Sequence, residues 1–327
     1  MKLKLILLLF VFSFSSHAVV IKIATLTPDG TTIMKNMRSA AKEVLKRTDG
    51  RVKIKMYPGG VMGNESSILR KMRINQLHGA IISSGSLNRA YKDTSIYGMP
   101  FLFNSHKEVL YTRNKMDKLI IKGLEKAGLI SFGIIESGFA YILSNTPVKS
   151  PSELRKQKFW IPDNASTRNA VKVFNLQPIP LPFGDVLAGL QTHLVDTIAI
   201  SPIAAIALQW HTQVKYLTDM PLLYGWGTLV INKKTMKKIK PSDKKIVHEV
   251  MSATFKKIDL QNQKDNIAAL AALKNQGIQF IQPNTKQLNE WRALAQEGNA
   301  KLVSKGFNSK KMYNLIKKHI SDYQKKK

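Results

Sequence analysis

Metal-binding and catalytic chemistry have little support in the residue types of this chain. The sequence contains no cysteine, which excludes thiol catalysis and cysteine-based metal sites. The histidines beyond residue 18 form no i, i+4 pair and no H-E-x-x-H motif. Carboxylates such as Glu136 and Asp185 form no recognisable acid/base pair along the sequence. We therefore predict that the protein is not an enzyme and needs neither a metal nor a cofactor.

Three glycine-containing stretches also fail as nucleotide or nucleophile motifs. The stretch GWGTLV has Val230 where a dinucleotide loop needs its third glycine, and it opens a strand rather than a helix. PGGVMGNE lacks the Lys and Ser/Thr of a phosphate loop. SSGSL, around Ser84, lacks the paired glycines of a nucleophile elbow.

The formal net charge of the chain is +30, and its lysines are spread between apolar positions rather than gathered in one block. Such a spread is typical of a solvated surface, so we expect no nucleic-acid partner. A basic surface of this kind favours transient contact with an anionic membrane surface through long-range attraction.

The first 18 residues have the pattern of a secretory signal peptide. MKLK is basic, Leu5 to Phe14 is apolar, and SSHA ends in small residues. We expect cleavage after Ala18, which leaves a periplasmic chain with a formal charge of +28. The apolar run is shorter than the roughly 20 residues of a membrane span. The remaining length suggests about two domains.

Strand and helix patterns alternate along the front and middle of the chain, which predicts an α/β fold with a parallel-dominated sheet. We predict strands at residues 19–25, 52–57, 79–83, 129–136, 140–144, 158–161, 196–201 and 225–232. We predict helices at residues 31–47, 65–76, 166–174, 285–303 and 309–320. We also predict one helix that ends near residue 193 and another that begins at residue 202. Ser150 is placed to cap a short turn.

Residues 241–276 contain no glycine and no proline after Pro241, and apolar residues recur through them at helical spacing. We predict one helix of roughly 50 Å, at about 1.5 Å per residue. That length favours a helix bridging two domains, and the alternative is a break near residues 259–265. An α/β chain with two lobes and no catalytic apparatus is typical of a binding protein whose ligand lies between the lobes.

Six segments, in order, carry a resemblance to a known family. They are TDGRVKIKMYPGGVMGNE, LRKMRINQLHGAIIS, MPFLF, SPSELRKQKFWIPDN, PIPLPFGDVLAGLQTHLVD and QVKYLTDMP. Together they resemble the solute-binding receptors of tripartite ATP-independent periplasmic (TRAP) transporters, of the C4-dicarboxylate-receptor (DctP) type. The resemblance covers nearly all of the chain after residue 18.

The resemblance implies a type II-like periplasmic binding protein fold with two lobes, a hinge and a long helix spanning both. It places lobe I at residues 19–137 and 224–260, and lobe II at residues 138–223 and 261–327. It also implies a monomeric receptor that binds a small solute between the lobes and delivers it to the membrane permease subunits of the transporter.

The sequence departs from the family at the ligand site. Members of the family normally carry an arginine, which binds the ligand carboxylate, at the position of Trp160 in KFWIP. Members of the family often carry a second basic residue in the strand after ESG, where this chain has the stretch Phe139 to Tyr141. Phe183 matches an aromatic residue that often packs on the ligand. The chain therefore resembles an atypical branch of the family that lacks the usual carboxylate-binding arginine.

An indole cannot neutralise a carboxylate as a guanidinium does. We therefore predict an apolar or aromatic-bearing solute, such as a weak organic acid. The alternatives are an ordinary carboxylate held by a repositioned cation, for which Arg155, Lys158 and Arg168 are near in sequence, and a periplasmic lipid carrier. Trp160 itself has two interpretations, a pocket wall and a core aromatic. The predicted ligand-binding residues are Trp160, Phe183, Ser201, Phe139, Glu136, Thr27, Ser84, Trp210 and Trp226.

Overall fold

The computed structural model describes residues 18–326. The predicted signal peptide, apart from Ala18, lies outside the described residues. Among the helices of the described part, none is long and apolar enough to cross a membrane.

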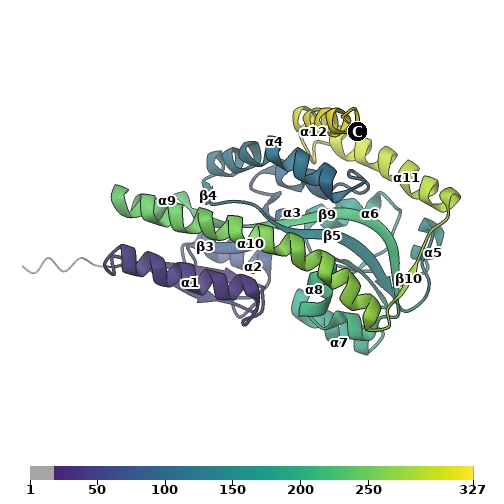
Figure 1. Cartoon of the computed structure of the whole chain (residues 1–327), viewed down its shortest axis with the longest axis horizontal. Coiled ribbons are helices and arrows are strands. Elements are labelled where there is room, and N and C mark those ends of the chain that lie inside the picture. Colours follow the sequence, from purple (N-terminus) through teal and green to yellow (C-terminus); the bar gives the residue numbers. More distant parts are fainter. Residues whose placement is uncertain (1–17, 327) are drawn as a thin grey trace, which may run out of the picture.

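Eight strands of the described chain form one mixed sheet, whose main path runs β2-β1-β3-β9-β5-β8 (Figure 1). The strands are β1 (Val19–Thr25), β2 (Val52–Tyr57), β3 (Gly79–Ser83), β4 (Leu129–Ser131), β5 (Ile135–Ser144), β6 (Trp160–Ile161), β7 (Ile179–Pro180), β8 (Thr197–Ile200), β9 (Tyr216–Asn232) and β10 (Gln279–Ile281). β6 and β7 form a separate parallel pair.

The expectation of a parallel-dominated sheet is wrong for the sheet as a whole, because four of its seven strand pairs are antiparallel. β1 pairs in parallel with β2 and β3, and β10 with β9. β9 runs antiparallel to β3, β4 and β5, and β5 runs antiparallel to β8. The antiparallel pairs arise because the long strand β9 runs opposite in direction to β3, β4 and β5, and it therefore joins the front strands to the rest of the sheet.

Two strands are longer than predicted. β5 continues through Gly138, where the register with β9 shifts and the backbone has a φ of +91°. A side chain at Gly138 would collide with Asn266, because a Cβ there would lie 2.5 Å from Asn266 Nδ2. β9 begins at Tyr216, nine residues before the predicted strand, and contains Pro221, which weakens the strand signal in sequence.

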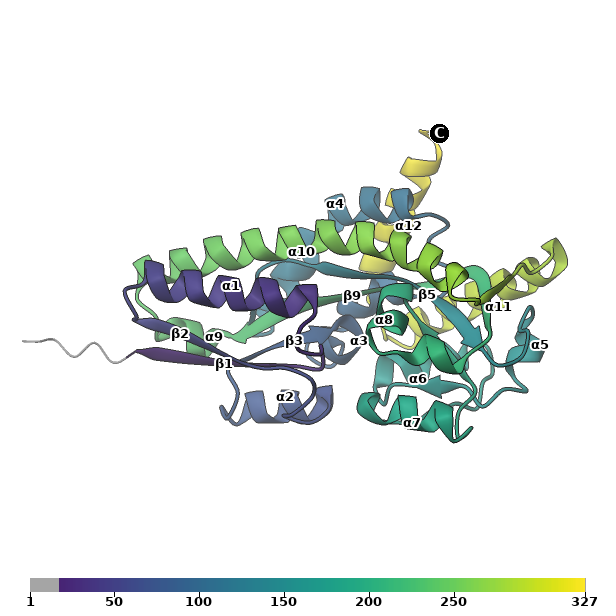
Figure 2. The same cartoon turned by 60° about the horizontal axis from the view of Figure 1, so that its bottom comes forward.

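Helices cover both faces of the sheet, and α10 runs along almost its whole length (Figures 1 and 2). The main helices are α1 (Thr32–Arg47), α2 (Glu65–Arg73), α3 (Ser84–Leu87), α4 (His106–Lys126), α5 (Pro151–Leu154), α6 (Ala165–Lys172), α7 (Val186–Gln191), α8 (Pro202–Ala207), α9 (Lys233–Lys237), α10 (Pro241–Asn275), α11 (Thr285–Ser304) and α12 (Lys310–Gln324). Short 3-10 segments are η1 (Lys92–Gly98), η2 (Phe183–Asp185) and η3 (Trp210–Gln213).

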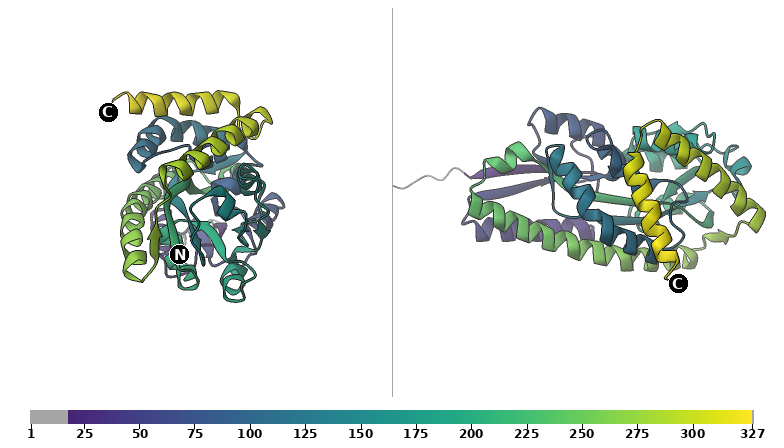
Figure 3. Two further views of the ribbon diagram at one scale, coloured as in Figure 1. Left: turned by 90° about the vertical axis from the view of Figure 1, so that its right-hand side faces the viewer. Right: turned by 90° about the horizontal axis from the view of Figure 1, so that it is seen from above.

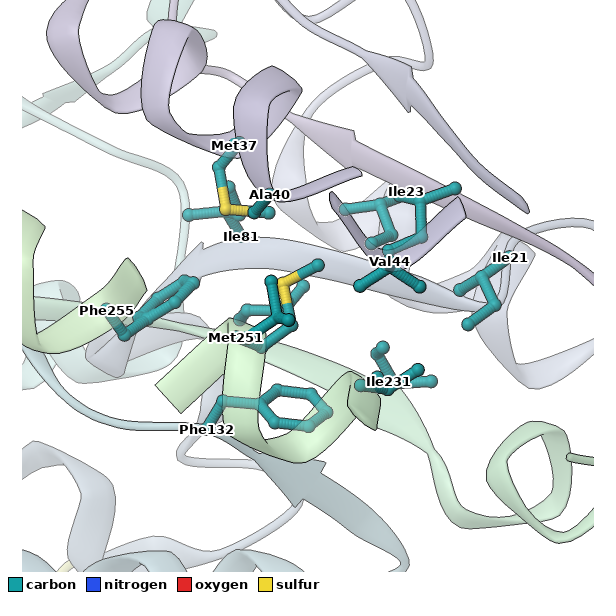
Figure 4. Close-up of a cluster of buried hydrophobic side chains, with 14 of the residues drawn as sticks. Ile21, Ile23, Met37, Ala40, Val44, Ile81, Phe132, Ile231, Met251 and Phe255 are labelled. Atoms are coloured by element: carbon teal, nitrogen blue, oxygen red, sulfur yellow. The ribbon is translucent and has the colours of Figure 1, made fainter. Parts of the chain in front are cut away.

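α10 is continuous over its 35 residues, so the alternative of a break at residues 259–265 is wrong. Its first half packs with α1 against β1, β3 and β9 around Met251 and Phe255, as Figure 4 shows. Its second half places Leu273 in the core of the other half of the molecule. The predicted helix spanning both lobes is therefore present, and burial at both ends holds it there.

Local signals fixed several helix starts as predicted. Ser150 caps α5 through a full capping box with Glu153, and Pro202 occupies the first turn of α8. Both features satisfy or remove amide groups that a helix N-terminus leaves unpaired.

The C-terminal pair α11 and α12 contacts both predicted lobes (Figure 3). On α11, Trp291 is fully buried and donates its indole N–H to Lys149 O at 3.0 Å. α12 packs on α4 and η1, although the predicted boundaries assign residues 261–327 to lobe II. The lobe boundaries themselves stay a prediction.

The start of α12 is held by one buried carboxylate. Asp93 accepts hydrogen bonds from Ser309 N at 2.6 Å and from Ser309 Oγ at 2.8 Å. We expect Asp93→Ala to lower the free energy of unfolding by about 1.5–3 kcal/mol, because hydrogen bonds to a charged group are lost and buried donors stay unpaired. Urea unfolding measures this, and hydrogen exchange should accelerate selectively in the first turn of α12. Asp29→Ala, in the exposed ion pair with Arg38, is the control and should change stability by less than about 1 kcal/mol. Equal effects would contradict the prediction.

Candidate ligand-binding site

Trp160 lies in a group of three aromatic rings in the predicted lobe II, which we call the aromatic cluster: Trp160, Phe183 and Trp210. The indole of Trp160 packs edge-on against Trp210, with centroids 5.1 Å apart, and lies 6.0 Å from Phe183. Phe183 and Trp210 are 5.0 Å apart. Trp160 and Trp210 are each 2 % exposed, whereas Phe183 is half-buried. The structure thus brings three of the predicted site residues together.

Short irregular elements position these rings. Trp160 opens β6, which pairs with β7, and Phe183 opens η2 directly after β7. Trp210 follows Gln209, whose φ of 59° turns the chain into η3. The indole N–H of Trp160 donates to Leu181 O at 3.1 Å. The only hydrogen-bond donor of the Trp160 side chain is therefore already paired, and the rest of the side chain is an apolar ring.

The predicted site residues that carry a hydroxyl group lie just after strand ends in both predicted lobes. Thr27 receives a hydrogen bond from Thr25 Oγ1 at 3.0 Å, and Ser84 opens α3 directly after β3. Ser201 occupies the position before α8 without capping it and is 4 % exposed. The two lobes touch beside these residues, because a Cβ at Gly85 would lie 3.3 Å from Asn164 Oδ1.

Glu65 was not among the predicted site residues, although it lies at the same strand end as Ser84. Its carboxylate accepts from Ser83 N at 2.7 Å, from Ser83 Oγ at 2.6 Å and from Ser86 Oγ. Glu65 is the last residue of the string PGGVMGNE, which belongs to the first segment of the family resemblance. This string is the sequence signal that could have identified Glu65.

Glu136 and Trp226 lie on adjacent strands, on the side covered by α4 rather than in the aromatic cluster. Glu136 is 1 % exposed. Its carboxylate accepts from Tyr224 Oη at 3.0 Å, lies 2.7 Å from His106 Nε2 and accepts from Asn266 Nδ2 at 3.3 Å. Both oxygens of Glu136 are thus engaged by protein groups.

The side chains of Phe139 and Trp226 pack on the same hydrophobic core. Phe139 packs edge-on against Tyr224, with centroids 5.6 Å apart. Trp226 packs against Tyr97 at 6.3 Å, and its buried indole N–H has no partner among the described residues. These residues therefore form a group separate from the aromatic cluster.

Arg113 is the centre of the network around Glu136 and was not predicted from sequence. Its guanidinium binds Asp259 through both terminal nitrogens at 3.0 Å, and also donates to Asp117, Tyr224 Oη and Ile134 O. It is 5 % exposed. Burial raises the pKa of Asp117, and the positive charge of Arg113 acts in the opposite direction. Burial also raises the pKa of Tyr224 well above its ordinary value, so this hydroxyl stays protonated. The arrangement ties α4, β5, β9 and α10 together where the long strands pass between the lobes.

The three basic residues considered as repositioned cations have local partners. Lys158 Nζ donates to His193 O at 3.0 Å, Arg155 Nε donates to Phe174 O at 2.9 Å, and Arg168 pairs with Asp163. Among residues 18–326 there is also no cluster of three or more His, Asp or Glu side chains that could hold a metal ion.

The mixed sheet with helices on both faces and one long helix along it is the fold of a two-lobed binding protein. A family model for the bacterial extracellular solute-binding proteins of family 7 (DctP) matches residues 23–305, so the chain belongs to this family. Members of this family bind solutes and are not enzymes, which agrees with the expectation from the residue types.

Curated relatives and solved structures are similar over most of the chain. The DctP C4-dicarboxylate-binding periplasmic protein of Rhodobacter capsulatus is 20 % identical over 85 % of each chain. The YiaO 2,3-diketo-L-gulonate-binding periplasmic protein of Escherichia coli is 27 % identical over 60 % of each chain. A sugar acid binding protein from Advenella mimigardefordensis, solved with galactonate, superposes with a TM-score of 0.84 at 18 % identity, covering 94 % of this chain and 99 % of that one. A TRAP solute-binding protein from Desulfovibrio salexigens, solved with orotic acid, gives 0.82 at 18 % identity, covering 93 % and 99 %.

Proposed function

We propose that the protein is the periplasmic receptor of a TRAP transporter. In this proposal it binds an apolar or aromatic-bearing solute, such as a weak organic acid, between its lobes and delivers it to the membrane permease. The aromatic cluster carries the proposal on the solute. Trp160 occupies the position where the family resemblance expects the carboxylate-binding arginine, and its only hydrogen-bond donor is already paired with Leu181 O.

The local contacts of the basic side chains support the same solute class. A carboxylate buried without a cation costs several kcal/mol or binds a proton. Arg155, Lys158 and Arg168 are engaged by groups of their own neighbourhood, which disfavours a multiply charged ligand. A weak acid with an apolar ring needs only one polar contact, for which the hydroxyls of Thr27, Ser84 and Ser201 are available at the strand ends.

The second candidate is a receptor for a sugar acid. This candidate is favoured by the sugar acids that similar proteins bind, 2,3-diketo-L-gulonate and galactonate. Another similar protein was solved with orotic acid. Orotic acid joins a ring to a carboxylate and fits the first candidate equally well. A lipid carrier is the third candidate.

Thermal unfolding in the presence of a ligand panel tests these proposals. The panel contains aromatic monocarboxylates, succinate, galacturonate and a fatty acid. We expect aromatic monocarboxylates to raise Tm by several degrees, because a ligand at a hundred times its Kd adds about 2.7 kcal/mol of stability. Native mass spectrometry of the freshly purified protein identifies any solute that is retained.

The remaining outcomes separate the candidates. A Tm shift with succinate or galacturonate alone would overturn the aromatic solute but keep the receptor. A shift with the fatty acid alone would indicate a lipid carrier. Binding of no small molecule, together with normal folding, would contradict the receptor function.

A further inference from the structure

A basic hollow lies on the surface at the C-terminal end of α2, outside the candidate ligand-binding site. It is open to solvent. We call it the α2 hollow, and its lining includes Met62, Ser67, Arg70, Lys71, Arg73 and Ile74. In Figure 2, α2 lies along the edge of the molecule opposite α10.

The three cations of the α2 hollow have no carboxylate partner within residues 18–326. Arg70 donates to Ser67 Oγ at 2.9 Å, and Lys71 donates to Met62 O at 2.9 Å. Arg70 and Arg73 are both exposed. Arg38 and Arg47 are exposed arginines paired with Asp29 and Glu249, whereas Arg89 and Arg292 are exposed and, like Arg70 and Arg73, form no ion pair among the described residues. The hollow therefore presents a local excess of positive charge.

Two exposed aliphatic residues flank the lining of the hollow in sequence: Val61 directly precedes Met62, and Ile74, itself part of the lining, directly follows Arg73. Val61 is 72 % exposed and Ile74 is 64 % exposed, and within the described chain only Ile267 is comparable among the large hydrophobic residues. Exposed aliphatic groups next to arginine and lysine form the combination with which peripheral proteins enter a lipid interface. The cations meet phosphate groups there, and the aliphatic groups are buried among the acyl chains.

We propose that the α2 hollow is a contact site for anionic phospholipid, at which Arg70, Lys71 and Arg73 bind headgroup phosphates and Val61 and Ile74 enter the interface. The formal net charge of +30 supports a membrane rather than a protein partner. Its lysines are spread along the chain, which attracts an extended anionic surface, and the α2 hollow then fixes the orientation. The proposal extends the expectation of transient membrane contact and is independent of the identity of the solute.

Co-sedimentation of the full mature chain with lipid vesicles tests the proposal. The vesicles are phosphatidylcholine alone, or phosphatidylcholine with roughly one-third phosphatidylglycerol. We expect binding to the anionic vesicles only, weakening as salt is raised. The double variant R70E/R73E should bind these vesicles at least about tenfold more weakly, since each cation near an anionic surface contributes about 1 kcal/mol, or about fivefold.

The matched control is K256E/K257E on α10. Both lysines are exposed and form no ion pair in the described structure, and the double variant changes the net charge by the same amount. We expect it to weaken binding by less than about threefold. V61S/I74S should lower the fraction of binding that survives at high salt.

Several results would overturn the proposal. An equal loss of vesicle binding in R70E/R73E and K256E/K257E would mean that the overall charge of the protein drives binding and that the α2 hollow is not a specific contact site. Retained vesicle binding by R70E/R73E would exclude the α2 hollow. If that variant binds vesicles normally but loses uptake with its reconstituted permease, the surface serves a protein partner instead. Far-UV circular dichroism and Tm establish that each variant is folded.

Discussion

Arg113→Met is expected to lower the free energy of unfolding by about 3–5 kcal/mol, because it leaves the buried carboxylate of Glu136 and the part-buried carboxylates of Asp117 and Asp259 without their cation. Arg113 is 5 % exposed and binds Asp259 in a two-point contact, with Asp117 and Tyr224 as further partners. Methionine retains much of the side-chain volume, so the loss reports on the ionic contacts more than on a cavity. Urea unfolding of the purified chain gives the difference.

The control is Lys118→Met on the same helix, since Lys118 is exposed and forms no ion pair in the described structure. It should change stability by less than about 0.5 kcal/mol. R113M/D259N should recover part of the loss, because asparagine can still accept the hydrogen bond from Glu136 N, which is 2.8 Å from Asp259 Oδ1. A loss below about 1 kcal/mol for R113M would show that the network does not hold the hinge region together.

The loss in R113M should also shrink as pH falls from neutrality. Burial raises the pKa of Asp117, and Arg113 and the hydrogen bond from Tyr97 Oη oppose this rise. The variant loses the opposing effect of Arg113 and keeps only that of Tyr97, so we expect the pKa of Asp117 to rise further. A carboxyl group whose folded pKa exceeds its unfolded pKa adds stability at low pH, and this contribution disappears as pH rises through the folded pKa. Unfolding free energies compared at about pH 7 and near pH 5 measure the trend. A pH-independent difference would contradict it.

The parts of the fold that local signals dictate could be predicted from the sequence. α1 follows its apolar spacing, the capping box at Ser150 forms as expected, and α10 is unbroken because residues 241–275 contain no helix breaker after Pro241. The first half of β9 could not be predicted in this way, since Pro221 interrupts its strand pattern. What holds it is pairing with β5 and β10, strands that are distant in sequence.

The candidate site likewise has some features that could be predicted from the sequence and others that could not. The aromatic positions were predicted by comparison with a family pattern, and three of them lie together in the structure. The partners of Glu136 could not be predicted, because Arg113 and Asp259 lie 146 residues apart and neither carries a local signal of its role. Likewise, no sequence pattern indicates that Leu181 O accepts the hydrogen bond of Trp160.

Trp160→Ala is expected to lower the free energy of unfolding by about 3–5 kcal/mol and to abolish measurable solute binding if Trp160 forms the pocket wall that we propose. The ring is 2 % exposed and packs against Trp210 and Phe183, so its removal opens the aromatic cluster. Trp160→Phe should keep the solute within a few-fold of its original affinity, because the lost N–H already belongs to Leu181 O. Calorimetric titration with the solute identified by mass spectrometry measures both effects.

Trp291→Ala separates a loss of binding from a loss of stability. Trp291 is also fully buried, donates its indole N–H to a carbonyl oxygen, Lys149 O, and packs against Phe101 and Phe174. It belongs to a different hydrophobic cluster, with α11. We therefore expect Trp291→Ala to destabilise the protein as much as Trp160→Ala does while leaving solute affinity nearly unchanged. If both alanine variants bind the solute equally well, Trp160 is a core aromatic, and the solute contacts must come from other residues. If Trp160→Arg folds and gains affinity for galacturonate, the position faces the ligand, because a guanidinium binds a carboxylate through two hydrogen bonds only where the two can meet.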